Sequence, residues 1–372
     1  MSAYGSIIVS SPPARCLYDF DLVTCDGRLL LLGTANQNHT ICGWDPLADE
    51  WTEYRLQNAA LEEGTDFSEI TSLGAAVVDG RVVVGGGGEF QGFSTWDLAS
   101  GQVRLYEQPD VVGSVGTARF GDHTMFVVGS ADGFGVTLWD PAAVEPDEDE
   151  DDDPEAGPLE IVVEQLTGRS TASSAVAAGF WDGRRLLVAG DGHGRVSMAD
   201  VDTSTVVARL PAPAKGAVAD RAILYCAPTE APAVDGSASG DSASGGTVAA
   251  HTAATDFALT SVDGAVRVLA AGGHRLYVGD PTVASWLQVF EVPGGPIGCL
   301  DARRMNDRTF CVTGAQDGTI CVWDLAERRL LLQPSNEHGS TVYGVRIAEL
   351  DGQPVVISAA HDGTVRVLEL PF

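Results

Sequence analysis

A nine-residue phrase occurs twice near the end of the chain, at 316–324 and at 361–369. The first copy reads QDGTICVWD and the second reads HDGTVRVLE, so an Asp-Gly dipeptide stands at the same place in both. Asp-Gly favours a tight turn, and the alternation of small and apolar residues after it favours a β-strand. The two copies start 45 residues apart. A repeat of this length is one supersecondary unit, so several stacked copies are expected to form the fold.

Five other segments carry weaker versions of the same unit. Each contains an apolar strand, a turn, a second strand and a third strand that ends at or near a Trp-Asp position. The seven marker positions are 45, 97, 140, 200, 280, 324 and 369, so consecutive markers lie 52, 43, 60, 80, 44 and 45 residues apart. The period-2 alternation within these runs indicates antiparallel strands, and no segment shows a convincing helix pattern.

Repeats of about 40–45 residues with four strands each are typical of propeller blades. The sequence therefore predicts an all-β fold, a single seven-bladed β-propeller of four-stranded antiparallel blades over 1–372. The blades are expected at 14–56, 66–108, 112–167, 172–211, 218–292, 294–333 and 338–370, with 5–11 completing the last one. In blade three the fourth strand is expected late, at 159–166.

The two ends of the chain are expected to close the ring together. The sequence stops at residues 370–372, directly after the third strand of blade seven, and leaves no residues for a fourth strand. Near the other end, residues 6–10 (SIIVS) form a strand-like run that Pro12 and Pro13 terminate. We expect this run to pair with blade seven as a clasp strand, which would leave no long unpaired edge.

Two glycine-rich stretches invite comparison with phosphate-binding loops. Neither 85–88 (GGGG) nor 190–194 (GDGHG) fits a nucleotide-binding motif, and neither precedes a predicted helix whose N-terminus could hold an anion. We therefore predict that both are turns between strands, where glycine supplies positive φ.

Two insertions interrupt the repeat pattern. Residues 145–157 begin with EPDEDEDDDPE, and such a run of carboxylates repels itself and favours disorder over the fixed geometry of a calcium site. Residues 228–250 are mostly Ser, Gly and Ala, which is flexible-loop composition. The second insertion contains GDSASGG, but a nucleophilic serine needs a rigid turn, a positioned base and an oxyanion hole. We expect a linker there and no catalytic residue.

The charge balance excludes some partners and favours others. With 22 basic and 52 acidic residues the formal net charge is −30, and Lys215 is the only lysine. Binding to nucleic acid or to an anionic membrane depends on Lys and Arg, so we expect neither. The acidity either keeps the protein soluble or steers a basic partner toward it.

Cysteine and histidine usage favours a cytoplasmic protein without a metal. The seven cysteines include no C-x-x-C pair, so structural thiols in a reducing compartment are expected rather than disulfides. The N-terminus lacks the basic and apolar regions of a signal peptide. The seven histidines are scattered singly, and we expect no metal and no cofactor.

The repeat resembles the WD-repeat β-propeller family, most clearly at 308–324 and 338–369. The resemblance implies a buried tetrad in each blade: a His before the first strand, a Ser or Thr on the second, the turn Asp, and the Trp. In blade seven the matching residues are His338, Ser358 and Asp362, with Leu368 at the Trp position. In blade six they are Thr313, Asp317 and Trp323; the His is missing, with Pro296 nearby.

The resemblance also implies where a partner would bind. In the family, residues before the turn Asp and at the start of each first strand line one face of the propeller, and here they are Ala131, Gln316, His361, Thr341 and Tyr343. Tyr343 and His361 best fit an interaction hot spot by residue type. The expected function is a non-catalytic scaffold for a protein or peptide. The alternatives are an enzyme or small-molecule binder that uses the central channel, and a structural subunit of a larger assembly.

Overall fold

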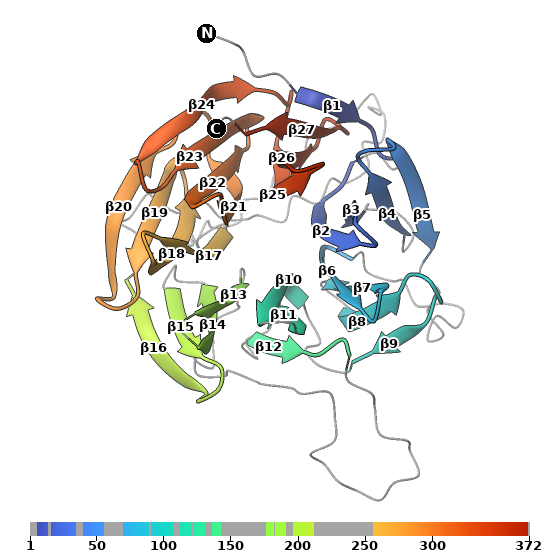
Figure 1. Cartoon of the computed structure of the whole chain (residues 1–372), viewed down its shortest axis with the longest axis horizontal. Coiled ribbons are helices and arrows are strands. Elements are labelled where there is room, and N and C mark those ends of the chain that lie inside the picture. Colours follow the sequence, from blue (N-terminus) through green and yellow to red (C-terminus); the bar gives the residue numbers. More distant parts are fainter. Residues whose placement is uncertain are drawn as a thin grey trace, which may run out of the picture.

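The chain forms a ring of seven β-sheets around a central axis (Figure 1). The computed structural model describes residues 6–13, 16–34, 40–55, 70–88, 91–106, 112–120, 123–130, 136–142, 176–181, 183–190, 196–211 and 256–370. Six sheets have four antiparallel strands, and the third has three strands among the described residues. The prediction of an all-β, seven-bladed propeller is confirmed. No described residue lies in a helix, and hence none in a helix that could cross a membrane.

In blades one to six the described strands follow chain order from the axis to the outer rim, and in all seven blades the innermost strands surround the axis (Figure 1). Blade one consists of β2 (Asp19–Cys25), β3 (Arg28–Thr34), β4 (Thr40–Asp45) and β5 (Glu50–Arg55). Blade two consists of β6 (Ser72–Val78), β7 (Arg81–Gly88), β8 (Gln91–Asp97) and β9 (Val103–Leu105). Blade three consists of β10 (Val112–Phe120), β11 (His123–Ser130) and β12 (Val136–Trp139). Blade four consists of β13 (Val176–Trp181), β14 (Arg184–Gly190), β15 (Val196–Asp200) and β16 (Thr205–Leu210).

The remaining blades repeat this arrangement. Blade five consists of β17 (Asp256–Val262), β18 (Ala265–Gly272), β19 (Arg275–Asp280) and β20 (Ser285–Glu291). Blade six consists of β21 (Ile297–Met305), β22 (Arg308–Ala315), β23 (Thr319–Asp324) and β24 (Arg329–Asn336). Blade seven consists of β25 (Val342–Leu350), β26 (Gln353–Ala360), β27 (Val365–Glu369) and β1 (Ser6–Ser10). The predicted late strand at 159–166 and both insertions lie outside the described residues.

The outer strand of blade seven comes from the other end of the chain. The strand order in this sheet is β1-β27-β26-β25, and β1 pairs antiparallel with β27 from Ser6↔Leu368 to Ser10↔Val365. The predicted clasp strand is thus confirmed. A polar contact anchors its end to blade one, because the Ser10 hydroxyl donates to Asp49 Oδ1 at 2.6 Å and accepts from Trp51 Nε1 at 2.9 Å.

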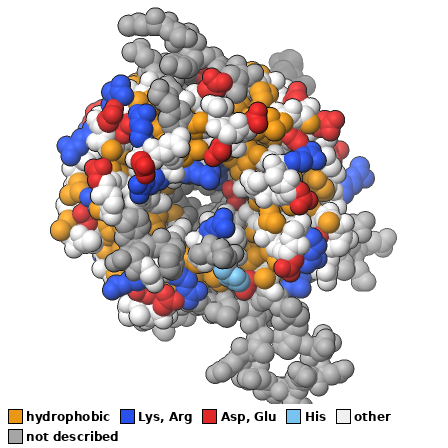
Figure 2. Space-filling view, in the orientation of Figure 1, with side chains coloured by type: hydrophobic (Ala, Val, Ile, Leu, Met, Phe, Trp, Pro, Cys, Tyr) orange, Lys and Arg blue, Asp and Glu red, His pale blue; other side chains and the backbone are white. Residues whose placement is uncertain are grey.

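The hydrophobic core is divided into seven clusters, one at each junction between neighbouring blades. The cluster between blades seven and one, for example, joins Phe20 and Trp44 to Ile357 and Val367. Every blade therefore buries apolar side chains on both faces, and burial of these faces is what favours closure of the ring. The centre stays open: Figure 2 shows a hollow with Lys and Arg side chains (blue) around it.

The tryptophan of the repeat fills this core, and blade five obtains it from a different strand. Trp44 is fully buried, and Trp96, Trp139 and Trp323 are nearly so. Blade five has Gly279 at this position, and a Cβ there would lie 2.9 Å from the ring of Trp286 on β20. The space that the missing side chain leaves is occupied by this indole and by Leu210 of blade four, whose Cδ2 would lie even closer to the same Cβ.

The marker aspartate has two structural roles. One carboxylate oxygen caps the turn after the third strand, as Asp324 Oδ1 accepts from Glu327 N at 3.0 Å. The other accepts from an arginine at the start of the second strand, as Asp324 Oδ2 does from Arg308 Nη2 at 2.6 Å. Burial alone would raise the pKa of Asp324, but the Glu327 amide and the Arg308 guanidinium outweigh it and lower the pKa. The same pairing recurs as Arg28–Asp45, Arg81–Asp97 and Arg267–Asp280.

Blade seven departs from this pattern for a topological reason. Glu369 stands at the marker position and is exposed. Its blade takes its fourth strand from β1, so no turn leads from the third strand to the fourth and no cap is required.

The predicted turn at 85–88 is wrong. Gly85 to Gly88 lie inside β7, and none of them has positive φ. Glycine is required here by crowding rather than by backbone conformation. A Cβ on Gly85 would lie 2.9 Å from the rings of both Phe93 and Phe126. In the other glycine-rich stretch Gly190 ends β14, and 191–195 lie outside the described residues.

Candidate interaction site

Three ring side chains meet where blade seven adjoins blade one, and we call Tyr18, Tyr343 and His361 the seam cluster. The ring centroids of Tyr18 and Tyr343 lie 5.3 Å apart, and Tyr343 meets the imidazole of His361 edge-on at 5.9 Å. Tyr18 and Tyr343 are partly exposed and His361 is exposed. Aromatic pairs at this distance attract one another beyond their burial. The cluster is therefore a small ordered surface of low conformational entropy.

Main-chain and side-chain hydrogen bonds hold the loops beside this cluster. The His361 amide donates to Thr341 O at 2.9 Å, and the Thr341 hydroxyl donates to Gln316 O of blade six at 3.0 Å. The structure thus brings four of the five predicted binding residues to one side of the ring, in blades six and seven. Ala131, the fifth, lies outside the described residues.

Tyr18 is not among the binding residues predicted from the sequence. It directly precedes β2, the first strand of blade one, as Thr341 directly precedes β25. The rule that selected Thr341 and Tyr343, applied to blade one, would have included it. Its proximity to Tyr343 could not be foreseen, because 325 positions separate the two residues in the chain.

A buried histidine supports the loop beneath the cluster. His338 is fully buried; its Nδ1 lies 3.1 Å from Asp362 Oδ2 and its Nε2 lies 2.9 Å from Ser358 Oγ. Asp362 also accepts from Thr364 N at 2.9 Å and from Gly339 N at 3.1 Å. The network joins the segment before β25 to the turn after β26, so it positions Tyr343 and His361 from below.

The network shifts the pKa values of both ionisable members. Burial lowers the pKa of His338, although the Asp362 carboxylate would raise it. Burial alone would raise the pKa of Asp362, but the Thr364 hydrogen bond and the His338 ring outweigh it and lower the pKa. A neutral imidazole beside an ionised carboxylate is the resulting state near neutral pH.

Blade six arranges its corresponding residues differently. Asp317 accepts from Thr319 N at 3.0 Å, and although burial alone would raise its pKa, hydrogen bonds including that of Thr319 lower it. Thr313 and Trp323 are buried, and within the described part of the chain the Trp323 indole N–H has no hydrogen-bond partner. No histidine of the described residues stands at the position of His338 in this blade, so its turn is held by Asp317 and by packing.

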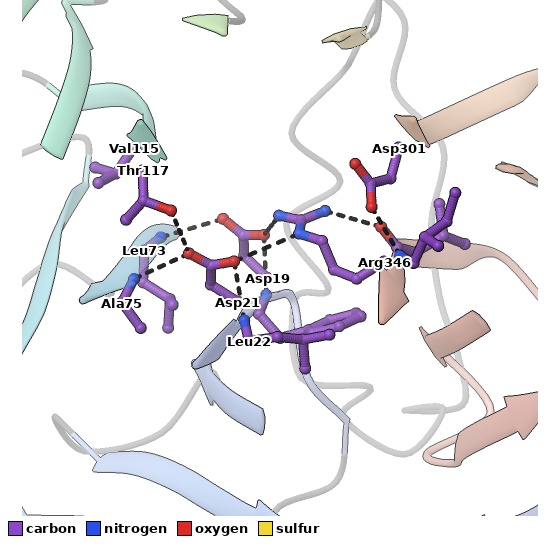
Figure 3. Close-up of polar contacts among 12 residues, drawn as sticks. Asp19, Asp21, Leu22, Leu73, Ala75, Val115, Thr117, Asp301 and Arg346 are labelled. Atoms are coloured by element: carbon purple, nitrogen blue, oxygen red, sulfur yellow. Dashed lines mark hydrogen bonds and ion pairs between the residues drawn. The ribbon is translucent and has the colours of Figure 1, made fainter. Parts of the chain in front are cut away.

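A belt of polar contacts links neighbouring first strands around the channel (Figure 3). Asp19 Oδ2 accepts from Leu73 N at 3.1 Å, and Asp21 Oδ2 accepts from Ala75 N at 3.0 Å, so blade one is tied to blade two. Asp301 Oδ2 of blade six accepts from Ile347 N of blade seven at 2.7 Å. Each of these carboxylates thus satisfies a backbone amide of the next blade.

Arg346 of blade seven lies between these carboxylates on the inner side of the seam (Figure 3). Its guanidinium is 3.7 Å from Asp21 Oδ1 and 3.9 Å from Asp19 Oδ1, and it lies over the Phe20 ring at 5.4 Å. The belt therefore continues from blade seven to blade one through a cation rather than through a backbone amide.

Metal ligation and the reactivity of one thiol can be assessed for the described residues. No group of three or more His, Cys, Asp or Glu side chains among them is placed to hold a metal ion. Cys321 is buried, and burial raises the pKa of its thiol to about 12, so the thiolate form is negligible at neutral pH.

Comparison with known proteins shows the fold alone. No protein-family model matches the chain. Among solved structures, the crystal structure of the computationally designed Ika8 protein is similar at a TM-score of 0.57 and 19% sequence identity, and the match covers 98% of this chain and 100% of that chain. A likeness at this level of identity carries no function with it.

Proposed function

We propose that the chain is a divergent WD-repeat propeller that acts in the cytoplasm as a non-catalytic scaffold. The proposed binding surface is the seam cluster, with Thr341 and Gln316 beside it. The observation that carries this proposal is the contact of Tyr18, Tyr343 and His361, three ring side chains from separate segments on one partly exposed surface. Rigid aromatic side chains supply contact area at low entropic cost, as binding hot spots require.

The partner is a protein or peptide with a basic surface. Asp317 and Asp362 directly follow Gln316 and His361, and both carboxyls keep lowered pKa values, so both are charged at neutral pH. The whole chain carries a formal charge of −30. Such a field raises the association rate of a cationic partner, and salt screens it.

The channel carboxylates support an enzyme less well. Asp19, Asp21 and Asp301 face the channel, but each accepts a hydrogen bond from a backbone amide of the neighbouring blade. These hydrogen bonds explain why carboxylates are present in the channel: they link neighbouring blades, and no substrate is needed to account for them.

A third role, as a structural subunit of an assembly, has one observation in its favour. The outer strands β16 and β20 expose Val207, Leu287 and Val289 at 41%, 47% and 50%, where charged residues usually protect a sheet edge. Light scattering after size exclusion tests this role. An assembly that dissociates in Leu287→Glu/Val289→Glu would support it, and a monomeric intact protein would reject it.

Affinity capture from the cytosol of the source cells tests the scaffold. The intact protein is compared with Tyr343→Ala/His361→Ala and with a distant control, His123→Ala/Leu287→Ala, whose residues are also exposed. We expect one or more proteins to be retained by the intact chain and the control and lost with the seam double variant. Equal retention by all three proteins would contradict the proposed surface.

A further inference from the structure

We propose that a partner on the seam cluster bridges blade seven and blade one, so that its binding is coupled to closure of the ring. This coupling rests on the interaction role proposed above and adds a regulation to the same surface.

The seam differs from the six other junctions in how the chain crosses it. Elsewhere the blades follow one another in sequence, so a continuous main chain joins the two blades of every other junction. At the seam it runs from β1 to β2, so the main chain links blade seven to blade one only where β1 pairs with β27. This clasp has five residues, and its register is irregular between Ser6 and Ile8. Seam opening therefore requires the loss of one short strand, whereas any other junction stays covalently linked.

The inner side of the seam is held by side-chain packing. A Cβ on Gly344 would lie 2.7 Å from the Phe20 ring, so the ring of blade one lies directly against the backbone of blade seven. Arg346 covers the same ring and approaches Asp21 at 3.7 Å. These contacts, like the apolar cluster beneath them, form only when the two blades are together.

The seam cluster is divided between the two sides of this junction. Tyr18 belongs to blade one, and Tyr343 and His361 belong to blade seven. Opening of the seam would separate Tyr18 from Tyr343, which lie 5.3 Å apart in the closed ring. The binding surface is therefore complete only in the closed state.

Thermodynamic linkage connects binding of the partner to closure of the ring. A ligand that binds only the closed ring multiplies the equilibrium constant for closure by 1 + [L]/Kd, where [L] is the free ligand concentration. The reverse also holds, because the apparent affinity falls in proportion to the closed fraction. The partner would act as a second clasp on the inner side, opposite to β1 on the outer rim.

Hydrogen exchange measured by mass spectrometry tests the coupling. The probe is a peptide selected from a random display library on the intact protein and counter-selected on Tyr343→Ala/His361→Ala. In blade seven β1 is separated by β27 and β26 from β25, the strand that carries Tyr343. At 100 times its Kd, we expect the peptide to slow exchange in β1 by up to about a hundredfold. The outer strands β20 and β24 serve as controls and should keep their rates.

Each contrary result overturns the coupling. Protection confined to segments around residues 18, 343 and 361 would mean that the peptide binds without closing the seam, and would leave the scaffold role intact. Equal slowing in β20 and β24 would show a general stabilisation with no special seam. A selection that yields no peptide lost with the double variant would remove both the surface and the coupling.

A second measurement uses deletion of residues 1–11. If the ring without its clasp is open nine-tenths of the time, peptide affinity falls about tenfold. Unchanged affinity in a folded deletion variant would contradict the coupling. Should that variant not fold, the exchange measurement on the intact chain decides.

Discussion

Asp-Gly dipeptides occupy two different turns in this chain, and they act differently in each. Between first and second strands, both residues are left-handed, with φ of 51° at Asp26 and 75° at Gly27. This is the backbone of a two-residue type I′ hairpin. After the second strand of blade seven only Gly363 is left-handed, at 76°, and Asp362 contributes its carboxylate to the His338 network. The dipeptide thus predicts a turn, while its neighbours decide which one.

The buried histidine predicts a dependence of stability on pH. Burial lowers the pKa of His338 in the folded chain below its ordinary value of about 6.5. On acidification the unfolded chain therefore takes up the proton first, so the free energy of unfolding falls as pH drops below about 6.5 and is constant above it. One proton limits the slope to about 1.4 kcal/mol per pH unit.

Urea unfolding at pH 5.5 to 7.5 measures this slope. His338→Gln should lose it, and should also lower stability by roughly 1–3 kcal/mol because Ser358 and Asp362 lose a partner. The exposed His361→Gln is the control and should keep the slope. If the slope persists in His338→Gln, another group causes it.

At the scale of one element, strand β7 shows why a run of glycines can be extended. Gly85, Gly86 and Gly87 lie between tightly packed neighbours, and side chains from neighbouring segments or from the next blade fill the space that each leaves. For Gly87, a Cβ would lie 2.6 Å from Val112 Cγ2 and 2.9 Å from Gly92 O. Composition alone favours a turn here, whereas packing against blade three requires a strand.

Gly87→Ala should therefore destabilise the protein, by about 1–3 kcal/mol, because the added methyl has no room beside Val112. Gly339→Ala is the matched control, since no atom lies within 4 Å of its added Cβ and its φ is not positive. Differential scanning calorimetry of both variants compares them. Equal losses would mean that backbone freedom rather than crowding explains the glycine at position 87.

At the scale of the whole molecule, stability depends on closure of a ring. Seven apolar clusters lie at seven junctions, and each needs both neighbouring blades. No single blade can bury both of its faces alone. The seam is the junction where non-covalent pairing of β1 replaces a covalent link, so small changes in β1 should affect the whole ring.

Two adjacent residues of the clasp provide the test. Ile8 packs against the apolar cluster at the seam, whereas Val9 is 50% exposed on the other face of β1. Ile8→Asp should lower the free energy of unfolding by roughly 2 kcal/mol, because a carboxylate would replace a partly buried apolar side chain. Val9→Asp adds the same charge and should have a small effect. Similar melting temperatures for the two variants would show that β1 does not hold the ring.

The sequence by itself determined the class of fold, the number of blades and the clasp, because these follow from the repeat period and from strand alternation. Both signals are local: QDGTICVWD identifies a turn and a strand wherever it lies. The resemblance of these repeats to the WD-repeat family selected Gln316, Thr341, Tyr343 and His361 as residues of one face, because they precede a turn Asp or stand at the start of a first strand.

Only the tertiary structure decided contacts that cross between blades or between the ends of the chain. The contact of Tyr18 with Tyr343 and the approach of Arg346 to Asp21 join residues more than 320 positions apart, and no spacing rule links them. The extended glycines of β7 and the Trp286 side chain that fills the gap at Gly279 likewise depend on what the neighbouring strand or blade presents. Local pattern fixes each blade, whereas side-chain packing between blades fixes which surfaces meet at the seam.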